Sequence, residues 1–203
     1  MRLFVAVRLP EDTAEAAFRI LPEVLPALRR VRPDLLHLTL AFLGDVPDAR
    51  LEAVADACGA AAGGAEPFAV SLDRLGSFPP RRGDAAIWMG VTQGADPLRR
   101  LAEVVRAQLA RADVPFDPKP FVAHVTLARI RGEAGIAERR TIAAALTRIR
   151  PPALVFRAER IEVVQSVLSP KGPRYSSLRA TPLEGARFEQ PGRERRHRAG
   201  DPR

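Results

Sequence analysis

Apolar residues in this chain follow two patterns: short runs that alternate with polar residues, and longer stretches in which they recur every third or fourth position. Alternation is typical of a strand with one buried face, and the longer spacing is typical of an amphipathic helix. The clearest helical pattern covers residues 96–111. Its apolar positions are Leu98, Leu101, Val104, Val105 and Leu109.

Along the chain, these patterns predict a mixture of strands and helices. We expect strands over residues 2–9, 35–43, 68–75, 85–91, 121–130, 154–167 and 174–181. We expect helices over residues 14–28, 47–62, 96–111 and 136–149, and a loop over residues 76–84. The elements divide into two comparable blocks, which indicates an internal duplication and an α+β fold of two lobes with mainly antiparallel pairing.

The composition is that of a globular protein with one large domain or two small lobes. Of the 203 residues, 46% are hydrophobic and 28% are charged. Cys58 is the one cysteine, which excludes an intramolecular disulfide and a cysteine-based zinc site, and we interpret it as a small buried hydrophobe. The first apolar run is interrupted by Arg8, and no segment approaches ~20 apolar residues. We therefore expect a cytoplasmic protein without a signal peptide or membrane span.

The chain is basic, with a formal net charge of +8, and 30 of its 32 basic residues are arginine. Residues 187–203 hold six arginines and three acidic residues without an apolar period, so we predict a disordered basic tail over 184–203 after a domain over 1–183. Arginine suits phosphate, which favours an RNA or phosphate partner. A solvated arginine-rich surface explains the same charge, and both interpretations stay open at this point.

Two of the three histidines stand in matching sequences. His37 lies in LHLTLAFLG (residues 36–44) and His124 lies in AHVTLAR (residues 123–129), so each is followed by threonine at the second position. With seven threonines in the chain, a chance match of this kind at two of three histidines has a probability of ~0.3%. The third histidine, His197, lies in the predicted tail without such a pattern.

On a strand, residues two positions apart share a face. His37 and Thr39 therefore share one face, as do His124 and Thr126, and the aliphatic residues between them face a core. Each strand then presents an imidazole and a hydroxyl spaced about 6–7 Å apart, which suits a compact anion. The two motifs lie in different blocks, so the duplicated fold predicts a central cleft that both motifs face.

This constellation resembles the 2H phosphoesterase superfamily, and within it the RNA 2′,3′-cyclic phosphodiesterase family, also called 2′-5′ RNA ligase. The resemblance covers residues 1–183. It depends on RLFVAV at 2–7, HLTLAFLG at 37–44, PFVAHVTLAR at 120–129 and QSVLSPKGPRY at 165–175. One departure is Ala123, where proline commonly precedes the second histidine in the family.

The resemblance implies that the chain hydrolyses RNA 2′,3′-cyclic phosphate ends to 2′-phosphates without a metal or other cofactor. It implies that His37 is the proton donor and His124 the proton acceptor. The threonines, Thr39 and Thr126, would then bind the non-bridging phosphate oxygens, and the neutral and protonated imidazoles that the reaction needs are both accessible near pH 7.

Other residues rank behind these as substrate-binding candidates. Phe42 is five positions after His37, so on a regular strand it faces the core and binds substrate only if a bulge intervenes. Arg129 has the same parity relative to His124, but it lies near the strand end, where it can turn toward phosphate. Three further arginines are candidates for the mouth of the cleft: Arg81, Arg82 and Arg174.

Two alternatives to the RNA phosphodiesterase remain. The same site can open another small cyclic phosphate, such as ADP-ribose cyclic phosphate, or the chain can be a non-catalytic protein that binds RNA ends. Two complete motifs argue against the latter, because a binder needs no pair of titrating groups. The expected partner is RNA with a cyclic phosphate end, including tRNA fragments and small nucleotides, and the expected state is a monomer.

Overall fold

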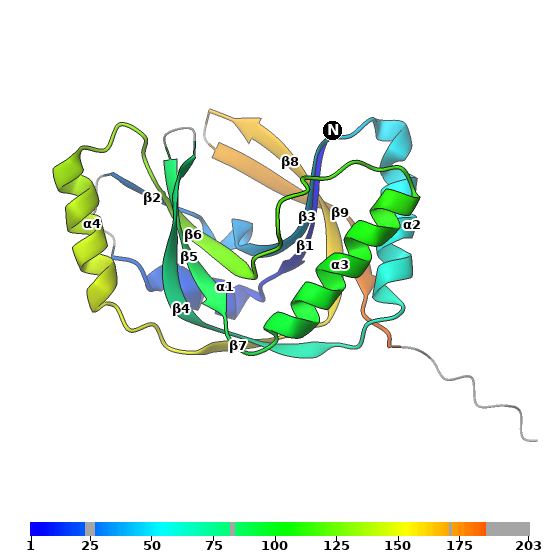
Figure 1. Ribbon diagram of the computed structural model, residues 1–203, viewed down its shortest axis with the longest axis horizontal. Helices are drawn as coiled ribbons and strands as arrows, with labels where there is room; N and C mark the ends of the chain where they lie inside the picture. The colour runs from blue at the N-terminus through cyan, green and yellow to red at the C-terminus, as the bar shows by residue number, and fades with distance from the viewer. Residues whose placement is uncertain (23–26, 82–83, 171, 186–203) are drawn as a thin grey trace, which may run out of the picture.

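A computed structural model of the protein describes residues 1–22, 27–81, 84–170 and 172–185. In these residues nine strands form one strongly curled sheet, and every strand pairing in it is antiparallel. Two helices stand together at one end of the molecule and a third stands at the opposite end (Figure 1). No helix in the described residues is long and apolar enough to cross a membrane.

The secondary structure follows the expected order with additional short elements. The strands are β1 (Arg2–Arg8), β2 (Leu28–Arg30), β3 (His37–Asp45), β4 (Phe68–Arg81), β5 (Asp84–Val91), β6 (His124–Ile130), β7 (Leu154–Ala158), β8 (Arg160–Ser169) and β9 (Gly172–Pro182). The helices are α1 (Glu11–Arg19), α2 (Leu51–Ala62), α3 (Ala95–Arg111) and α4 (Ile136–Arg148), with 3-10 turns η1 (Pro33–Leu35) and η2 (Asp48–Arg50).

The strand order is pseudo-symmetric about its centre. It runs β7-β4-β5-β6-β3-β1-β8-β9, with β2 attached to β6. The two strands that begin at the motif histidines, β3 and β6, meet in the middle, where Leu38 lies opposite Val125. The predicted two-lobed α+β fold with antiparallel pairing is therefore confirmed, although the two lobes share one sheet.

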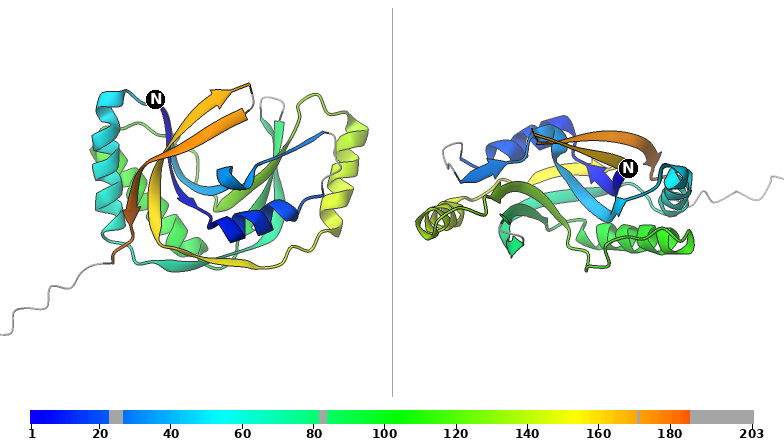
Figure 2. Two further views of the ribbon diagram at one scale, coloured as in Figure 1. Left: turned by 180° about the vertical axis from the view of Figure 1, so that it is seen from behind. Right: turned by 90° about the horizontal axis from the view of Figure 1, so that it is seen from above.

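Apolar alternation places the core on one face of this sheet. In β1, Leu3, Val5 and Val7 enter the main core, while Phe4 and Ala6 face the other side of the sheet. Helices α2 and α3 pack against each other at one end of the molecule, as Figure 2 also shows. The buried thiol on α2 belongs to this core, and burial raises the pKa of Cys58 to about 12, so it packs as an uncharged group, as expected.

The predicted helix over residues 14–28 is wrong in its second half. Helix α1 begins at Glu11 and ends at Arg19, shortly before Pro22, because the residue before a proline is disfavoured in the helical conformation. Residues 23–26 lie outside the described part of the chain. Further along, residues 28–30 form β2, which pairs with β6 and was not predicted.

Two strand predictions also need correction. Strand β4 continues through the expected loop to Arg81, because beyond Leu72 it pairs only with β5 and forms a sheet edge, where prolines are tolerated. The single strand expected over 154–167 divides at Glu159 into β7 and β8, since its two halves pair with strands in different lobes. Composition alone shows neither pairing.

The end of the described chain still bonds to the body. The amide of Glu184 donates to the Ala62 carbonyl at 3.4 Å, and the amide of Gly185 donates to the Ala65 carbonyl at 3.0 Å. These bonds join the last two described residues to the end of α2 and the chain that follows it. The remainder of the predicted tail, residues 186–203, lies outside the described residues.

Candidate active site

Both motif strands begin at their histidine and show the same pattern of burial. His37 and Thr39 are partly exposed at one face of β3, and the residue between them, Leu38, is fully buried. The pattern repeats in β6, where His124 and Thr126 are partly exposed. The prediction that each histidine shares a face with its threonine is confirmed.

A β-bulge interrupts β3 directly after its histidine–threonine pair. Thr39 and Ala41 pair with consecutive residues of β1, which leaves Leu40 as the extra residue. The insertion reverses the alternation, so Ala41 is buried and Phe42 lies on the same face as His37. The expectation that Phe42 packs in the core is therefore wrong, and the bulge considered as the alternative is present.

Strand β6 carries a bulge at the equivalent position. Thr126 and Ala128 pair with consecutive residues of β5, and Leu127 is the extra residue. Arg129 is thereby brought to the exposed face that also holds the histidine and threonine of this strand. In both lobes, therefore, a bulge brings the residue five positions after the histidine to the same strand face as the histidine.

The carbonyl groups of the two bulge residues accept hydrogen bonds from groups other than the paired strand. The Leu40 carbonyl accepts a hydrogen bond from Nε of Arg106 on α3 at 3.1 Å, and Nη1 of the same arginine donates to the Lys119 carbonyl at 2.8 Å. The Leu127 carbonyl accepts from the amide of Val31 at 2.7 Å. Arg106 therefore ties the bulge of one lobe to the segment that leads into the other motif strand.

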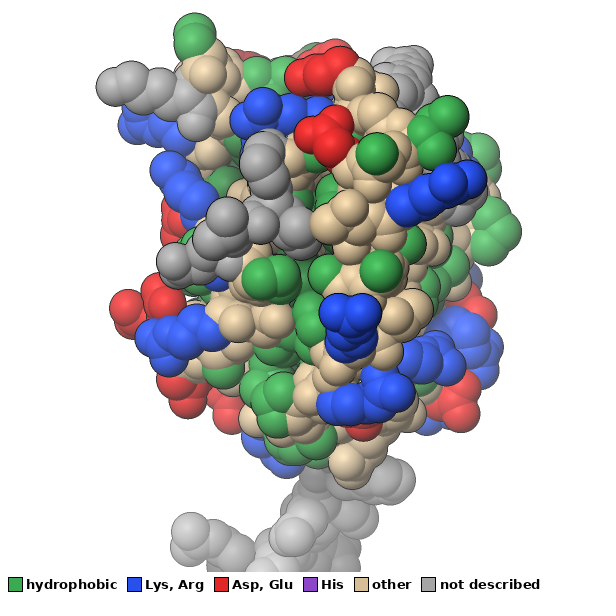
Figure 3. Space-filling model, turned by 90° about the vertical axis from the view of Figure 1, so that its left-hand side faces the viewer, with side chains coloured by type: hydrophobic (Ala, Val, Ile, Leu, Met, Phe, Trp, Pro, Cys, Tyr) green, Lys and Arg blue, Asp and Glu red, His purple; other side chains and the backbone are tan. Residues whose placement is uncertain are grey.

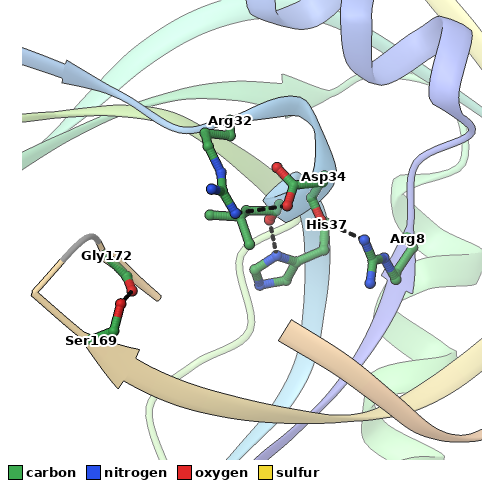
Figure 4. Close-up of polar contacts among 7 residues, drawn as sticks. Arg8, Arg32, Asp34, His37, Ser169 and Gly172 are labelled. Carbon is green, nitrogen blue, oxygen red and sulfur yellow. Dashed lines mark hydrogen bonds and ion pairs between the residues drawn. The ribbon is translucent and has the colours of Figure 1, made fainter. Parts of the chain in front are cut away.

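The two imidazoles are oriented by identical hydrogen bonds. Nδ1 of His37 donates to the Leu35 carbonyl at 2.7 Å, and Nδ1 of His124 donates to the Val122 carbonyl at 2.7 Å. Figure 4 shows the first of these bonds beside the Arg32–Asp34 pair. A carbonyl only accepts, so Nδ1 carries the proton and Nε2 is left as the titrating nitrogen of each ring.

Two aromatic rings pack against His37. Its ring lies 4.7 Å from that of Phe4 and 5.5 Å from that of Tyr175, measured between centroids. Neither residue was among the candidates, although Tyr175 is the single tyrosine of the chain and lies in a segment that carried the family resemblance. The scarcity of aromatic residues was the available signal.

Two other aromatic rings support His124. The centroid of Phe78 lies 4.8 Å from the imidazole and that of Trp88 lies 6.4 Å from it. Trp88 lies over two glycines of the sheet, because a Cβ at Gly76 would stand 2.3 Å from its ring and a Cβ at Gly90 would stand 2.9 Å from it. Because glycine has no side chain, these two positions leave the space that the tryptophan ring occupies.

We expect Gly76→Ala to destabilise the protein by about 1–3 kcal/mol, because the added methyl group overlaps the Trp88 ring. Unfolding in urea, followed by the fluorescence of this single tryptophan, measures the loss. Gly59→Ala is the matched control, since nothing lies within 4 Å of its Cβ and the helix α2 gains a better helix former. Equal stability of the Gly76 variant and the native chain would contradict the placement of the ring.

Burial lowers the basicity of both imidazoles. It lowers the pKa of His37 to about 4, with a smaller contribution from the positive charge of Arg8, which lies opposite it on β1. Burial also lowers the pKa of His124, and Arg129 adds to that effect. Both rings are therefore neutral at pH 7 in the free protein.

The six candidate residues of the motifs line one cleft of about 750 Å³. It is lined by Arg2, Phe4, Arg29, Arg30, Val31, Arg32, Leu35, His37, Thr39, Phe42, His124, Thr126, Arg129, Ser166, Leu168, Pro170, Gly172, Pro173 and Tyr175. The structure thus brings both motifs together in a single site. In the described part of the chain, no three His, Cys, Asp or Glu side chains gather as a metal-ligand cluster.

The arginines expected at the mouth of the cleft have different outcomes. Arg174 lies in an adjoining hollow and not in the cleft itself. Arg82 lies outside the described residues, and only the backbone of Arg81 is described, at the end of β4. Sequence reasoning missed the other cleft arginines, since Arg2 comes from β1 and three more come from β2 and the residues after it.

Fold and site together define a protein with two histidine–hydroxyl pairs that face one arginine-lined cleft. The family model of the 2′-5′ RNA ligase superfamily matches residues 10–168, and the chain belongs to this family. The expected membership is therefore confirmed.

Individual relatives agree with this assignment. The chain is 32% identical to an RNA 2′,3′-cyclic phosphodiesterase of Archaeoglobus fulgidus, over 88% of this chain and 98% of the relative. It is also 32% identical to a protein of that name from Geobacillus stearothermophilus, where the match covers 90% of this chain but spans only 57% of the relative. The chain is therefore similar to a whole relative in one case and to part of a longer one in the other.

Solved structures show the same fold. TT0787 of Thermus thermophilus superposes with a TM-score of 0.74 at 33% identity, over 91% of this chain and 99% of that one. Escherichia coli LigT complexed with 3′-AMP superposes with a TM-score of 0.71 at 29% identity, over 90% of this chain and 97% of that one. The curled antiparallel sheet is thus the fold of these proteins as well.

Proposed function

We propose that this chain hydrolyses RNA 2′,3′-cyclic phosphodiester ends to 2′-phosphomonoesters, by acid–base catalysis with two histidines and no metal. The observation that carries the proposal is the matched pair of imidazoles in one cleft, each held through Nδ1 so that Nε2 titrates. Relatives named for this activity across most of the chain's length support it.

In the proposed reaction, Nε2 of His124 takes a proton from water as the water oxygen attacks phosphorus. The bond from phosphorus to the 3′ oxygen breaks, and Nε2–H of His37 gives its proton to that oxygen. The products are a 2′-phosphate and a 3′-hydroxyl, so one water is consumed. The hydroxyls of Thr39 and Thr126 donate hydrogen bonds to the non-bridging oxygens, where negative charge concentrates.

The acid, His37, must be protonated when it acts, although its pKa is about 4 in the free protein. A bound phosphodiester brings a negative charge next to both imidazoles, and an opposite charge within hydrogen-bonding reach favours the protonated form. Substrate binding therefore raises the pKa of His37 and prepares the acid in the complex.

We expect bell-shaped pH dependences whose maxima differ between kcat/KM and kcat. For the free protein, one histidine must be protonated and the other neutral, and both have a pKa below 6.5, so kcat/KM peaks between about pH 4 and pH 6.5. It falls as pH rises above this window, because the acid loses its proton. The maximum of kcat lies at higher pH, since bound phosphate raises both pKa values. Steady-state rates from pH 4 to 9 measure this, and a kcat/KM maximum above pH 7 would contradict the lowered values.

The product of an oligonucleotide that ends in a 2′,3′-cyclic phosphate tests the proposed activity. A terminal 2′-phosphate supports it, a 3′-phosphate contradicts the assigned leaving group, and unchanged ends with tight retention identify a binding protein. ADP-ribose cyclic phosphate, assayed in parallel, tests the other substrate class. Turnover that EDTA abolishes and added metal restores would overturn the metal-free mechanism.

The finer parts of the proposal concern the cellular setting. We propose that the protein acts in the cytoplasm as a monomer, on tRNA fragments or other RNA pieces that carry the cyclic end. Sedimentation of the purified chain tests the oligomeric state. Comparison of RNA ends between cells with and without the protein tests the substrates.

A further inference from the structure

The cleft carries more positive charge than one cyclic phosphate requires. Five arginines line it, and no acidic residue is among its described lining residues. A 2′,3′-cyclic phosphodiester has a single negative charge, and the imidazoles and threonine hydroxyls already face it. The lining of the cleft therefore suits a ligand with more than one anionic group.

Strand β2 contributes two of these five arginines, Arg29 and Arg30. Arg29 on β2 lies directly opposite Arg129 on β6, at the edge of the cleft. Both side chains line the cleft, so this edge of it is positively charged.

A second hollow of about 340 Å³ adjoins the cleft. Its lining residues are Arg32, Ser169, Pro170, Gly172, Pro173 and Arg174. Four of these also line the main cleft, so the two spaces adjoin. Arg32 stands at the junction, and Arg174 belongs to the second hollow alone.

Arg32 is able to serve a ligand although it has a partner. Its guanidinium is 2.8 Å from the carboxylate of Asp34, and the two side chains are 56% and 60% exposed. Exposed ion pairs of this kind contribute about 0–1 kcal/mol, so a phosphate can compete for the arginine. Figure 4 draws the pair together with Ser169 and Gly172, where the Ser169 hydroxyl donates a hydrogen bond of 2.7 Å to the Gly172 carbonyl.

The β8–β9 hairpin supplies an apolar surface facing these arginines. Its side of the cleft holds Leu168, which is 67% exposed, together with Pro170, Pro173 and Tyr175. Sites for single-stranded nucleic acid combine aromatic or apolar surfaces for the bases with cations for the backbone. The face around α4 differs, since its basic side chains are scattered among acidic and apolar ones (Figure 3).

We propose that the second hollow, with Arg32 and Arg174, binds the phosphodiester that precedes the cyclic end, while the hairpin packs against the adjoining base. The inference rests on the proposed function and adds a substrate class to it. The preferred substrate is an oligonucleotide, whose backbone reaches the second hollow, and not a cyclic mononucleotide, which fills only the main cleft.

Kinetics with two substrates test this subsite. We expect a trinucleotide ending in a 2′,3′-cyclic phosphate to have a KM about tenfold lower than cytidine 2′,3′-cyclic monophosphate, with similar kcat, and its KM to rise more steeply with salt. Arg174→Gln raises the trinucleotide KM about three- to tenfold and changes the mononucleotide KM less than twofold. Arg100→Gln is the matched control, because Arg100 is exposed on α3 and lines neither space.

Each outcome separates the subsite from the proposed function. Equal KM values for the two substrates, or equal effects of Arg174→Gln on both, overturn the subsite while hydrolysis itself stands. If neither substrate is hydrolysed, the proposed function fails, and the same comparison is made by equilibrium binding of fluorescent ligands. Tighter binding of the trinucleotide that depends on Arg174 then still supports the subsite, and equal binding overturns it.

Discussion

Replacement of either His37 or His124 by alanine lowers kcat on a cyclic phosphodiester by about 10²–10⁴-fold, the range typical of a lost general acid or base. Each imidazole is held by a 2.7 Å bond from Nδ1 to a backbone carbonyl, which leaves Nε2 as the titrating atom, and alanine removes it. The double variant loses little more than either single variant, because an acid and a base that act in one step are not additive. Single-turnover rates with excess enzyme measure all three.

Asparagine at the same positions separates catalysis from folding. Its side-chain amide keeps a donor close to the place of Nδ1, so the bond to the Leu35 or Val122 carbonyl is retained while Nε2 is lost. We expect His37→Asn and His124→Asn to be as inactive as the alanine variants and as stable as the native chain. A near-native rate in any of these four proteins would refute the paired acid–base mechanism.

The threonine hydroxyls carry the next largest effect. Thr39→Val and Thr126→Val each lower kcat by about 10²-fold, which is the loss seen when one preorganised donor to a developing negative charge is removed. KM changes little, because the donors are worth most in the transition state. Valine keeps the branched shape that suits a strand, so the sheet is not disturbed.

Two further variants control this experiment. Serine at either position keeps a hydroxyl and restores most of the rate. Thr92→Val removes a hydroxyl that donates to Asp73 at 2.6 Å outside the cleft, and it leaves kcat unchanged. If the two cleft valine variants keep kcat within about threefold, the hydroxyls do not serve as the anion donors that we assign.

The local sequence pattern predicted the strand faces of the motif residues correctly, but it did not predict the faces of the residues that follow the bulges. The period of two correctly placed each histidine and threonine on one face, because it depends only on backbone geometry. The same period wrongly placed Phe42 in the core. The bulge at Leu40 arises from the register with β1, and the sequence around Leu40 shows no pattern that indicates it. The bulge depends equally on Arg106, which binds the Leu40 carbonyl from a helix 66 residues away along the chain.

The same distinction explains the residues that sequence reasoning missed. Tyr175 reaches His37 from β9, and Arg29 reaches the cleft from a three-residue strand that periodicity cannot detect. The strand expected over 154–167 was a correct reading of β propensity, but its division at Glu159 follows from which lobe each half joins. Such pairings are long-range contacts, and a single sequence does not encode them in any local pattern.

The sequence by itself determined the chemistry of this protein: two imidazoles, each with a hydroxyl on the same strand face, repeated once in each of two lobes. Those properties follow from residue type and from the alternation of side chains along a strand, and both depend only on the local sequence. Only the tertiary structure decided that Leu38 meets Val125 at the centre of one sheet, so that both motifs face a common cleft. It also decided which arginines and rings surround them, because those side chains come from strands whose positions depend on packing.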